Sequence, residues 1–375
     1  MMPVGAQERP PASHPSAPAV DASSAICGSN QRKPFMPLLL KTIAKRLLAT
    51  VALLWGVTVV TFLLVSVVPG DPAAANLSQQ AYDDPEIREA FRSKWGLDQP
   101  LIVQYGQYLW NILHGDLGVS QQTNRPVLED LSRYIPATIE IAIPAMVIAI
   151  IVAVALGILS AMRKGSALDN GIRVLSLTGL STPPFWLALV ALYVFFYIFG
   201  WVPNGGRLSN MYDPPPTITG MYTIDALAAG QITVFWDAVW HLALPVGILA
   251  VLTTSGLLRF VRSSMLEVLD SDYIRAAVAK GLPRRIITWR HVFKAGLLPV
   301  LTVSALTMAS LMGGAVLVEQ VLSWPGLGQY AYKSALGLDL QAILGVTLFV
   351  AIVYTGINLI VDVLYTVIDP RIGAK

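Results

Sequence analysis

The chain has 375 residues, of which 54% are hydrophobic and only 13% are charged. Soluble domains carry about a quarter charged residues, so this composition points to a membrane protein. The formal net charge of +3 is too small to indicate a nucleic-acid partner. Cys27 is the only cysteine, which excludes an intramolecular disulfide and a cysteine-rich metal site.

The first 34 residues are rich in Pro, Ala and Ser and contain no apolar run. They lack the hydrophobic segment that a cleavable signal peptide requires, and Ile26 before Cys27 argues against a lipoprotein signal. We therefore expect residues 1–34 to form a disordered tail and residues 35–372 to form the membrane domain.

Six apolar segments have the length of membrane-spanning helices. They are residues 47–68, 139–161, 174–202, 241–261, 297–318 and 342–365. Pro183 and Pro184 interrupt the third, where we expect a kink or a shortened span over residues 185–202. The sequence predicts an all-α polytopic membrane protein with six transmembrane helices.

Basic residues beside the apolar segments set the orientation, because cytoplasmic loops carry an excess of Lys and Arg. They lie before the first segment, between the second and third, between the fourth and fifth, and after the sixth: Arg32, Lys33, Lys41, Lys45, Arg46, Arg163, Lys164, Arg173, Arg262, Arg275, Lys280, Arg284, Arg285, Arg290, Lys294, Arg371 and Lys375. Residues 203–240, by contrast, contain only one basic residue, Arg207. We expect both termini and residues 262–296 to be cytoplasmic, and residues 69–136 and 203–240 to be external.

The larger external region, residues 69–136, is long enough to fold as a domain between the first two spans. Its stretches 85–95 and 101–113 mix apolar and polar residues at helical spacing. They predict short amphipathic helices over the outer side of the membrane domain.

The basic loop between the fourth and fifth segments contains the strongest local helix signal. Ser271 is placed to cap a helix over residues 272–280, Gly281 to end it, and Pro283 to block its continuation. The first residue of this helix is acidic and its last is basic, which matches the helix dipole. Such a helix is either a docking element or an ordinary amphipathic loop helix.

Residues 273–281, Tyr-Ile-Arg-Ala-Ala-Val-Ala-Lys-Gly, resemble the EAA loop of ABC importer permeases. In that family the helix inserts into a groove of a separate ATP-binding subunit and transmits ATP-driven closure. The resemblance implies this coupling role for Tyr273, Arg275, Ala276, Ala277, Lys280 and Gly281. Two departures, Arg275 in place of the glutamate and the long distance from Gly281 to Leu298-Pro299, resemble the peptide/nickel branch.

Further segments are similar to the B-type dipeptide and oligopeptide permeases of that branch. They are Pro-Gly-Asp-Pro at 69–72, Arg-Ser-Ser-Met-Leu-Glu-Val-Leu at 262–269, Val-Glu-Gln-Val-Leu-Ser-Trp-Pro-Gly-Leu-Gly at 318–328, Asn-Leu-Ile-Val-Asp-Val-Leu-Tyr at 358–365 and Asp-Pro-Arg at 369–371. Together the matches cover residues 41–372. Their order and spacing make the resemblance far more specific than any one of them.

The resemblance implies a permease subunit of a bacterial cell membrane importer. Its expected partners are a second, homologous permease, two ATP-binding subunits and an external substrate-binding protein. This chain contains no GxxxxGK[ST] loop, so ATP and Mg are expected on the partner chains, and no cofactor is expected here. Dipeptides or oligopeptides are the expected cargo, with nickel chelates, haem, glutathione or opines as alternatives in the same branch.

Four residues are candidates for the pathway or its gate. Glu319 and Asp362 are ionisable near span ends, where they either face a polar partner or reach the outer and inner interfaces. Asn358 lies one turn before Asp362 and is expected to face the same neighbour. Trp324 belongs to a Trp-Pro-Gly-Leu-Gly turn whose tryptophan is expected among lipid headgroups and whose glycines permit unusual backbone angles. That turn either positions the neighbouring spans or takes part in gating.

Two other functional classes have less support. A membrane enzyme would need a GxSxG serine, paired aspartates or an HExxH site, and a secondary transporter would show mid-membrane charge and an inverted repeat. The apolar segments show neither pattern. His114, His241 and His291 are scattered along the chain, which argues against a metal site or a proton relay.

Overall fold

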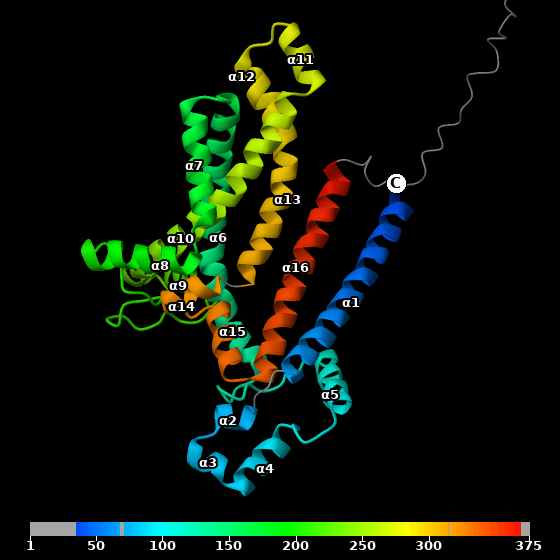
Figure 1. Ribbon diagram of the computed structural model, residues 1–375, viewed down its shortest axis with the longest axis vertical. Helices are drawn as coiled ribbons and strands as arrows, with labels where there is room; N and C mark the ends of the chain where they lie inside the picture. The colour runs from blue at the N-terminus through cyan, green and yellow to red at the C-terminus, as the bar shows by residue number, and fades with distance from the viewer. Residues whose placement is uncertain (1–34, 68–70, 314, 369–375) are drawn as a thin grey trace, which may run out of the picture. The chain divides into compact units, whose positions relative to one another are not determined.

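The computed structural model describes residues 35–67, 71–313 and 315–368, and helices form nearly all of its regular structure (Figure 1). Two compact units divide the chain, residues 1–48 and 49–375, and α1 (Phe35–Val67) begins in the first and ends in the second. The tail expected at residues 1–34 lies outside the described residues.

Four short helices follow α1. They are α2 (Pro72–Asn76), α3 (Gln79–Asp83), α4 (Pro85–Lys94) and α5 (Leu101–Leu113). The helices predicted at residues 85–95 and 101–113 are thus present as α4 and α5. Asp71 caps α2 by accepting a 3.0 Å hydrogen bond from the Ala73 N–H, and it pairs with Arg92 of α4 at 2.7 Å.

The second half of α1 packs against α5 through aromatic rings. Phe62 lies 5.3 Å from the ring of Tyr105 and 6.4 Å from the ring of Tyr108, centroid to centroid. The Tyr105 hydroxyl lies within hydrogen-bonding distance, 3.1 Å, of Thr58 Oγ1. Leu344 of α16 completes this buried cluster, so α5 is held against two apolar helices.

Three helices are long and apolar enough to cross a membrane unbroken. They are α6 (Val127–Met162), α10 (Ile232–Leu269) and α16 (Leu340–Ile368). The first two begin earlier than the predicted residues 139 and 241, because their initial turns pack on other helices although those turns are less apolar. Val127 and Leu131, for example, are buried against α15 (Leu327–Leu336).

The third predicted span is broken. It consists of α7 (Ala167–Ser181), α8 (Pro184–Leu192) and the π-helical segment η1 (Tyr193–Ile198). The two arms meet at 99°, where Thr182 and Pro183 adopt extended backbone. The kink expected at the proline pair is therefore present, but a straight helix over residues 174–202 is not.

The fifth predicted span is also irregular. It comprises α12 (Arg284–Ile286), the π-helical η2 (Ile287–Val292) and α13 (Phe293–Met312), with a 45° bend before Pro299. The helix ends at Met312 rather than at residue 318, and a separate helix, α14 (Val316–Val321), follows. Counting each bent pair as one span gives up to five spans, and the second half of α1 adds a shorter apolar helix over Leu48–Leu64.

The helices α6, α10 and α13 form the core at one end of the membrane domain and lie side by side in Figure 1. Small residues let them approach closely. A Cβ on Gly157 would lie 2.6 Å from Val261, and a Cβ on Gly296 would lie 2.6 Å from the sulfur of Met265. Ser264 Oγ of α10 also donates a 3.1 Å hydrogen bond to the Gly296 carbonyl of α13.

The remaining helices are short. α9 (Tyr222–Ala228) precedes α10, and α11 (Asp272–Ala279) lies in the loop between α10 and α13.

Candidate functional site

The helix α11 is fixed to the core by one face. Ile274 and Ala277 are buried in the cluster that joins α6, α10, η2 and α13. Gly281 adopts a φ of +75°, so the chain turns away in a backbone conformation that favours glycine. Lys280 is the C-cap rather than a helical residue, which makes α11 one residue shorter than predicted.

The other face of α11 is exposed and partly apolar. Tyr273 is 50% exposed, Val278 is 60% exposed, and Trp289 of the neighbouring η2 is 58% exposed. Of the six residues expected to contact a partner, five lie on the surface: Tyr273, Arg275, Ala276, Lys280 and Gly281. Ala277 is 9% exposed and anchors the helix instead.

The first turn of α11 is built differently from the prediction. Ser271 occupies the N-cap position, but its hydroxyl donates a 2.5 Å hydrogen bond backwards to the Val268 carbonyl and accepts none from the helix. Arg275 instead pairs with Asp272 at 3.2 Å and donates to the Asp270 carbonyl at 3.0 Å. The turn is thus held by the arginine that replaces the expected glutamate.

A buried ionic cluster lies close to this loop. Arg262 of α10 contacts both carboxylate oxygens of Asp169 in α7, at 2.8 and 2.9 Å. Ser160 of α6 donates a 2.5 Å hydrogen bond to the same carboxylate. The bidentate pair, the strongest geometry available to arginine, connects α10 to α7, and the Ser160 hydrogen bond adds α6.

Two residues expected at the outer side, Glu319 and Trp324, pack against the opposite end of α6. Glu319 of α14 is fully buried; its carboxylate accepts hydrogen bonds of 2.9 Å from Thr138 Oγ1 and 2.9 Å from the Gln329 N–H. Thr138 also accepts from the Leu327 N–H at 2.7 Å. The alternative that Glu319 reaches the interface is wrong, because α6 and α15 enclose it.

Trp324 is buried as well, at 1% exposure, and its indole N–H donates a 2.8 Å hydrogen bond to the Ala137 carbonyl of α6. The expected headgroup position is therefore wrong. In its turn the positive φ falls on Ser323, at 52°. Gly326 is needed for space instead, since a Cβ there would lie 2.5 Å from the Glu319 carboxylate.

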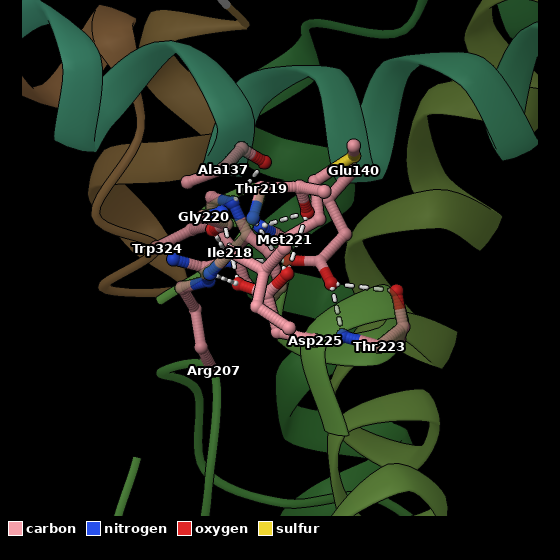
Figure 2. Close-up of polar contacts among 10 residues, drawn as sticks. All are labelled: Ala137, Glu140, Arg207, Ile218, Thr219, Gly220, Met221, Thr223, Asp225 and Trp324. Carbon is pink, nitrogen blue, oxygen red and sulfur yellow. Dashed lines mark hydrogen bonds and ion pairs between the residues drawn. The ribbon is translucent and has the colours of Figure 1, made fainter. Parts of the chain in front are cut away.

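A second polar network lies beside Trp324 and is drawn in Figure 2. Arg207 donates hydrogen bonds of 2.6 Å to Glu140 of α6 and 2.7 Å to the Gly220 carbonyl. Its guanidinium lies 3.7 Å from the ring centroid of Tyr222 and 5.8 Å from that of Trp324. Glu140 also accepts from the N–H and hydroxyl of Thr223, at 2.7 and 2.8 Å.

Asp225 organises the loop that carries Gly220 (Figure 2). Its carboxylate accepts hydrogen bonds from the N–H groups of Ile218, Thr219 and Gly220 and from the Thr219 hydroxyl. Burial raises the pKa of Asp225, but these hydrogen bonds outweigh it and hold the pKa below its usual value. The loop is therefore folded around a charged carboxylate and fastened to α6.

The sequence profile of the family "binding-prot-dependent transport system membrane comp, N-term" matches residues 39–142. The profile of "binding-protein-dependent transport system inner membrane component" matches residues 153–374. The chain belongs to this transporter family. Its members are transport permeases rather than enzymes, and the apolar helices agree with a multi-pass membrane protein.

Three relatives support the assignment over nearly their whole length. The "Probable D,D-dipeptide transport system permease protein" of Escherichia coli (strain K12) is 44% identical over 85% of this chain and 93% of its own. The dipeptide transport system permease protein of Alkalihalophilus pseudofirmus is 42% identical over 88% and 98%. The di/tripeptide transport system permease protein of Pseudomonas aeruginosa is 37% identical over 89% and 99%.

Of the four residues expected in the pathway or its gate, Asn358 is not brought to either network and lies partly exposed on α16. The side chain of Asp362 lies outside the described residues, so the expectation that Asn358 and Asp362 face the same neighbour stays a prediction. In the part of the chain that is described, no three His, Cys, Asp or Glu side chains are placed to hold a metal ion.

Sequence reasoning did not single out Glu140, Asp169 or Asp225. Each is an acidic residue at the start of a helix or within a predicted span, and such residues are costly unless paired. An acidic residue inside an apolar segment was a signal that could have drawn attention to Glu140.

Proposed function

We propose that this protein is the membrane-spanning permease subunit of an ATP-driven importer of dipeptides or short oligopeptides. The family assignment supports the permease role, and three relatives of nearly full-length similarity are named for dipeptide or di/tripeptide transport. The single structural observation that carries the proposal is α11, a helix anchored by one face and exposed by the other.

In this proposal the exposed face of α11 docks on an ATP-binding subunit. Tyr273 and Val278 supply apolar contact, while Arg275 and Lys280 supply charge at its rim. Because Ile274 and Ala277 belong to the core of the membrane domain, a displacement of α11 is passed to α10 and α13. ATP and Mg are held by the partner chains, and the energy of closure enters through this contact.

The proposed topology has six spans with both termini in the cytoplasm of a bacterial cell. The two bent pairs, the second half of α1 and the three long helices supply those six crossings. The regions 69–136 and 203–240 then lie outside; Ser120 of the first is bound to Asp339 before α16, and Arg207 of the second is bound to Glu140 of α6. The coupling loop 262–296 lies at the cytoplasmic end with the exposed Lys164–Asp270 pair.

The remaining partners of the proposal are a second, homologous permease and an external substrate-binding protein. Large apolar side chains on α1, α7, α8 and α10 are exposed in the single chain, among them Trp55, Leu175, Trp186 and Val251. Such surfaces suit lipid and a second membrane subunit. The external protein delivers the peptide to the outer regions.

The proposal is tested by purifying the tagged subunit from native membranes and reconstituting the recovered complex in lipid vesicles. We expect ATP-binding subunits to copurify, and ATP hydrolysis to rise when the binding protein and dialanine are added together. Glutathione, haem and nickel–histidine are the comparison ligands. Stimulation by one of these but not by peptides would overturn the cargo, and a subunit recovered without an ATPase from cells that express one would overturn the importer.

The docking contact is tested separately with single cysteines in a Cys27→Ser background. Val278→Cys on the exposed face is expected to form cross-links to the ATP-binding subunit. Ala277→Cys, on the buried face of the same helix, is the matched control and is expected to form none. Equal cross-linking at both positions, or none at Val278→Cys, would contradict docking through this face.

A further inference from the structure

A partly polar, open cavity of about 550 Å³ lies between α10 and α13, away from the networks of Glu319 and Arg207. Its lining includes one cation and three hydroxyl groups, on Arg259, Thr253, Ser263 and Thr307. Leu257, Phe260 and Val303 supply apolar walls, and Gly256 leaves room between them. A volume of this size is typical of sites that enclose a small organic molecule.

The cavity lies at the inner end of the membrane-spanning part of α10. No charged residue occurs from Leu242 to Leu258, and the helix ends at Leu269, where the exposed Lys164–Asp270 pair marks water. Arg262, three residues further along α10, contacts Ser160 near the end of α6, and the loop 262–296 is cytoplasmic in the proposed topology. Arg259 therefore lies about one helical turn inside the cytoplasmic end of this span.

Arg259 differs from the other arginine of the same helix segment. Arg262 is held by Asp169 and Ser160. Arg259 is exposed, and no carboxylate or carbonyl in the described part of the chain accepts a hydrogen bond from it. An ionised side chain at the inner end of a span usually faces a partner, a water-filled cavity or a transported group.

We propose that Arg259 is a substrate-binding residue of the translocation pathway and holds the terminal carboxylate of the peptide in this cavity. The proposal rests on the peptide-importer function proposed above. Guanidinium binds a carboxylate in a bidentate manner. Thr307 Oγ1 donates its proton to the Val303 carbonyl at 2.7 Å, so its oxygen is free to accept from a peptide N–H.

The walls suit this ligand better than they suit lipid. A lipid-facing surface of α10 and α13 would be apolar, whereas four of the cavity's side chains carry polar groups. The site also lacks a described carboxylate that would compete for the arginine. The contact is therefore open to an incoming anion, and a single charge–charge contact permits release as well as binding.

The test uses the reconstituted importer with Cys27→Ser as background, so that an introduced cysteine is unique in this chain. Arg259→Cys is expected to reduce uptake of radiolabelled dialanine at least ten-fold. Modification with 2-aminoethyl methanethiosulfonate restores a positive charge and is expected to recover uptake several-fold. Modification with 2-sulfonatoethyl methanethiosulfonate adds a negative charge and is expected to recover nothing.

Leu301→Cys is the matched control. Leu301 is exposed on α13 and does not line the cavity. It lies five residues after Gly296, and Arg259 lies five residues before Ser264, so both positions are equally far along their helices from the Ser264–Gly296 hydrogen bond. Dialanine uptake by the Leu301→Cys variant is expected to be the same after modification with either reagent. Labelling of Arg259→Cys, unlike that of Leu301→Cys, is expected to slow when dialanine and the binding protein are present.

Three results would overturn the inference while the importer still transports dialanine in the Cys27→Ser background. They are wild-type uptake by Arg259→Cys, recovery by both reagents alike, and labelling that dialanine leaves unchanged; the last indicates an arginine that faces lipid phosphate or the second permease. If Arg259→Cys does not assemble, Arg259→Lys decides: a several-fold rise in KM with little change in maximal rate supports the inference, and an unchanged KM overturns it. Absence of dialanine uptake in the background itself would instead contradict the proposed function.

Discussion

Arg207 donates a 2.6 Å hydrogen bond to Glu140, although 67 positions separate them in the chain, and both side chains are buried. Arg207→Met leaves the Glu140 charge without its partner, so we expect a loss of about 3 to 5 kcal/mol in the free energy of unfolding. The double variant Glu140→Gln/Arg207→Met is expected to lose less. Thermal unfolding in detergent measures both.

The exposed pair Arg133–Glu129, also at 2.6 Å, is the control for this prediction. Because water screens it, Arg133→Met is expected to cost less than about 1 kcal/mol. Equal losses for Arg207→Met and Arg133→Met would show that burial does not govern the contribution of the Arg207–Glu140 pair to stability.

Gly281→Val places a β-branched side chain at a φ of +75° directly after α11. We expect α11 to be displaced and, if it docks as proposed, dialanine uptake to fall by an order of magnitude while basal ATP hydrolysis continues. Gly96→Val, at a φ of +66° in the loop after α4, imposes similar backbone strain far along the chain from α11. If both variants lose the coupling of ATP hydrolysis to uptake equally, the cause is backbone strain rather than a disturbed docking contact.

Gly326→Ala adds a Cβ that would lie 2.5 Å from the carboxylate of Glu319. The carboxylate must move away from Thr138 and the Gln329 N–H, so we expect a loss of about 1 to 3 kcal/mol in stability. Gly106→Ala in α5 meets open space and is expected to be neutral or slightly stabilising. A neutral Gly326→Ala, measured by thermal unfolding, would mean that Glu319 is not held as tightly as its contacts indicate.

The loop folded around Asp225 is expected to loosen in acid because the pKa of Asp225 is depressed in the folded protein. A depressed pKa contributes stability above the unfolded pKa, and this contribution is lost as the pH falls through the folded value, below about 4. Limited proteolysis of residues 203–230 at pH 7 and at pH 3 measures the effect. Asp225→Asn should be cleaved readily at both pH values; protection of this variant at pH 7 would contradict the role of the charge.

The proposed topology places Ser271 in the cytoplasm and Asn204 outside. Single cysteines at these positions, in the Cys27→Ser background, are expected to react with a membrane-impermeant maleimide from opposite sides in intact cells and inverted vesicles. Ser271→Cys should react only in inverted vesicles. The reverse pattern would refute the orientation.

Much of the arrangement could be predicted because it depends on local chemistry. The apolar runs predicted α6, α10 and α16, and Gly281 predicted the end of α11. Pro183 and Pro184 predicted an interruption, but the 99° angle depends on how α7 and α8 pack. The predicted helix boundaries were wrong where tertiary contacts extend a helix. The start of α6 at Val127 is an example, because Val127 is buried against α15 and no local sequence pattern indicates that contact.

The sequence by itself determined the class of the protein, its apolar helices and the short helix that ends at Gly281 between α10 and α13, because hydrophobic length and turn chemistry act over a few residues. The tertiary structure alone decided that Trp324 and Glu319 are enclosed by α6, that Glu140 meets Arg207, and that Arg259 faces a partly polar cavity. These relationships join residues far apart in the chain. Only the packing of helices determines which charged groups are paired, since the sequence of a single helix is the same whether or not a neighbouring helix supplies the opposite charge.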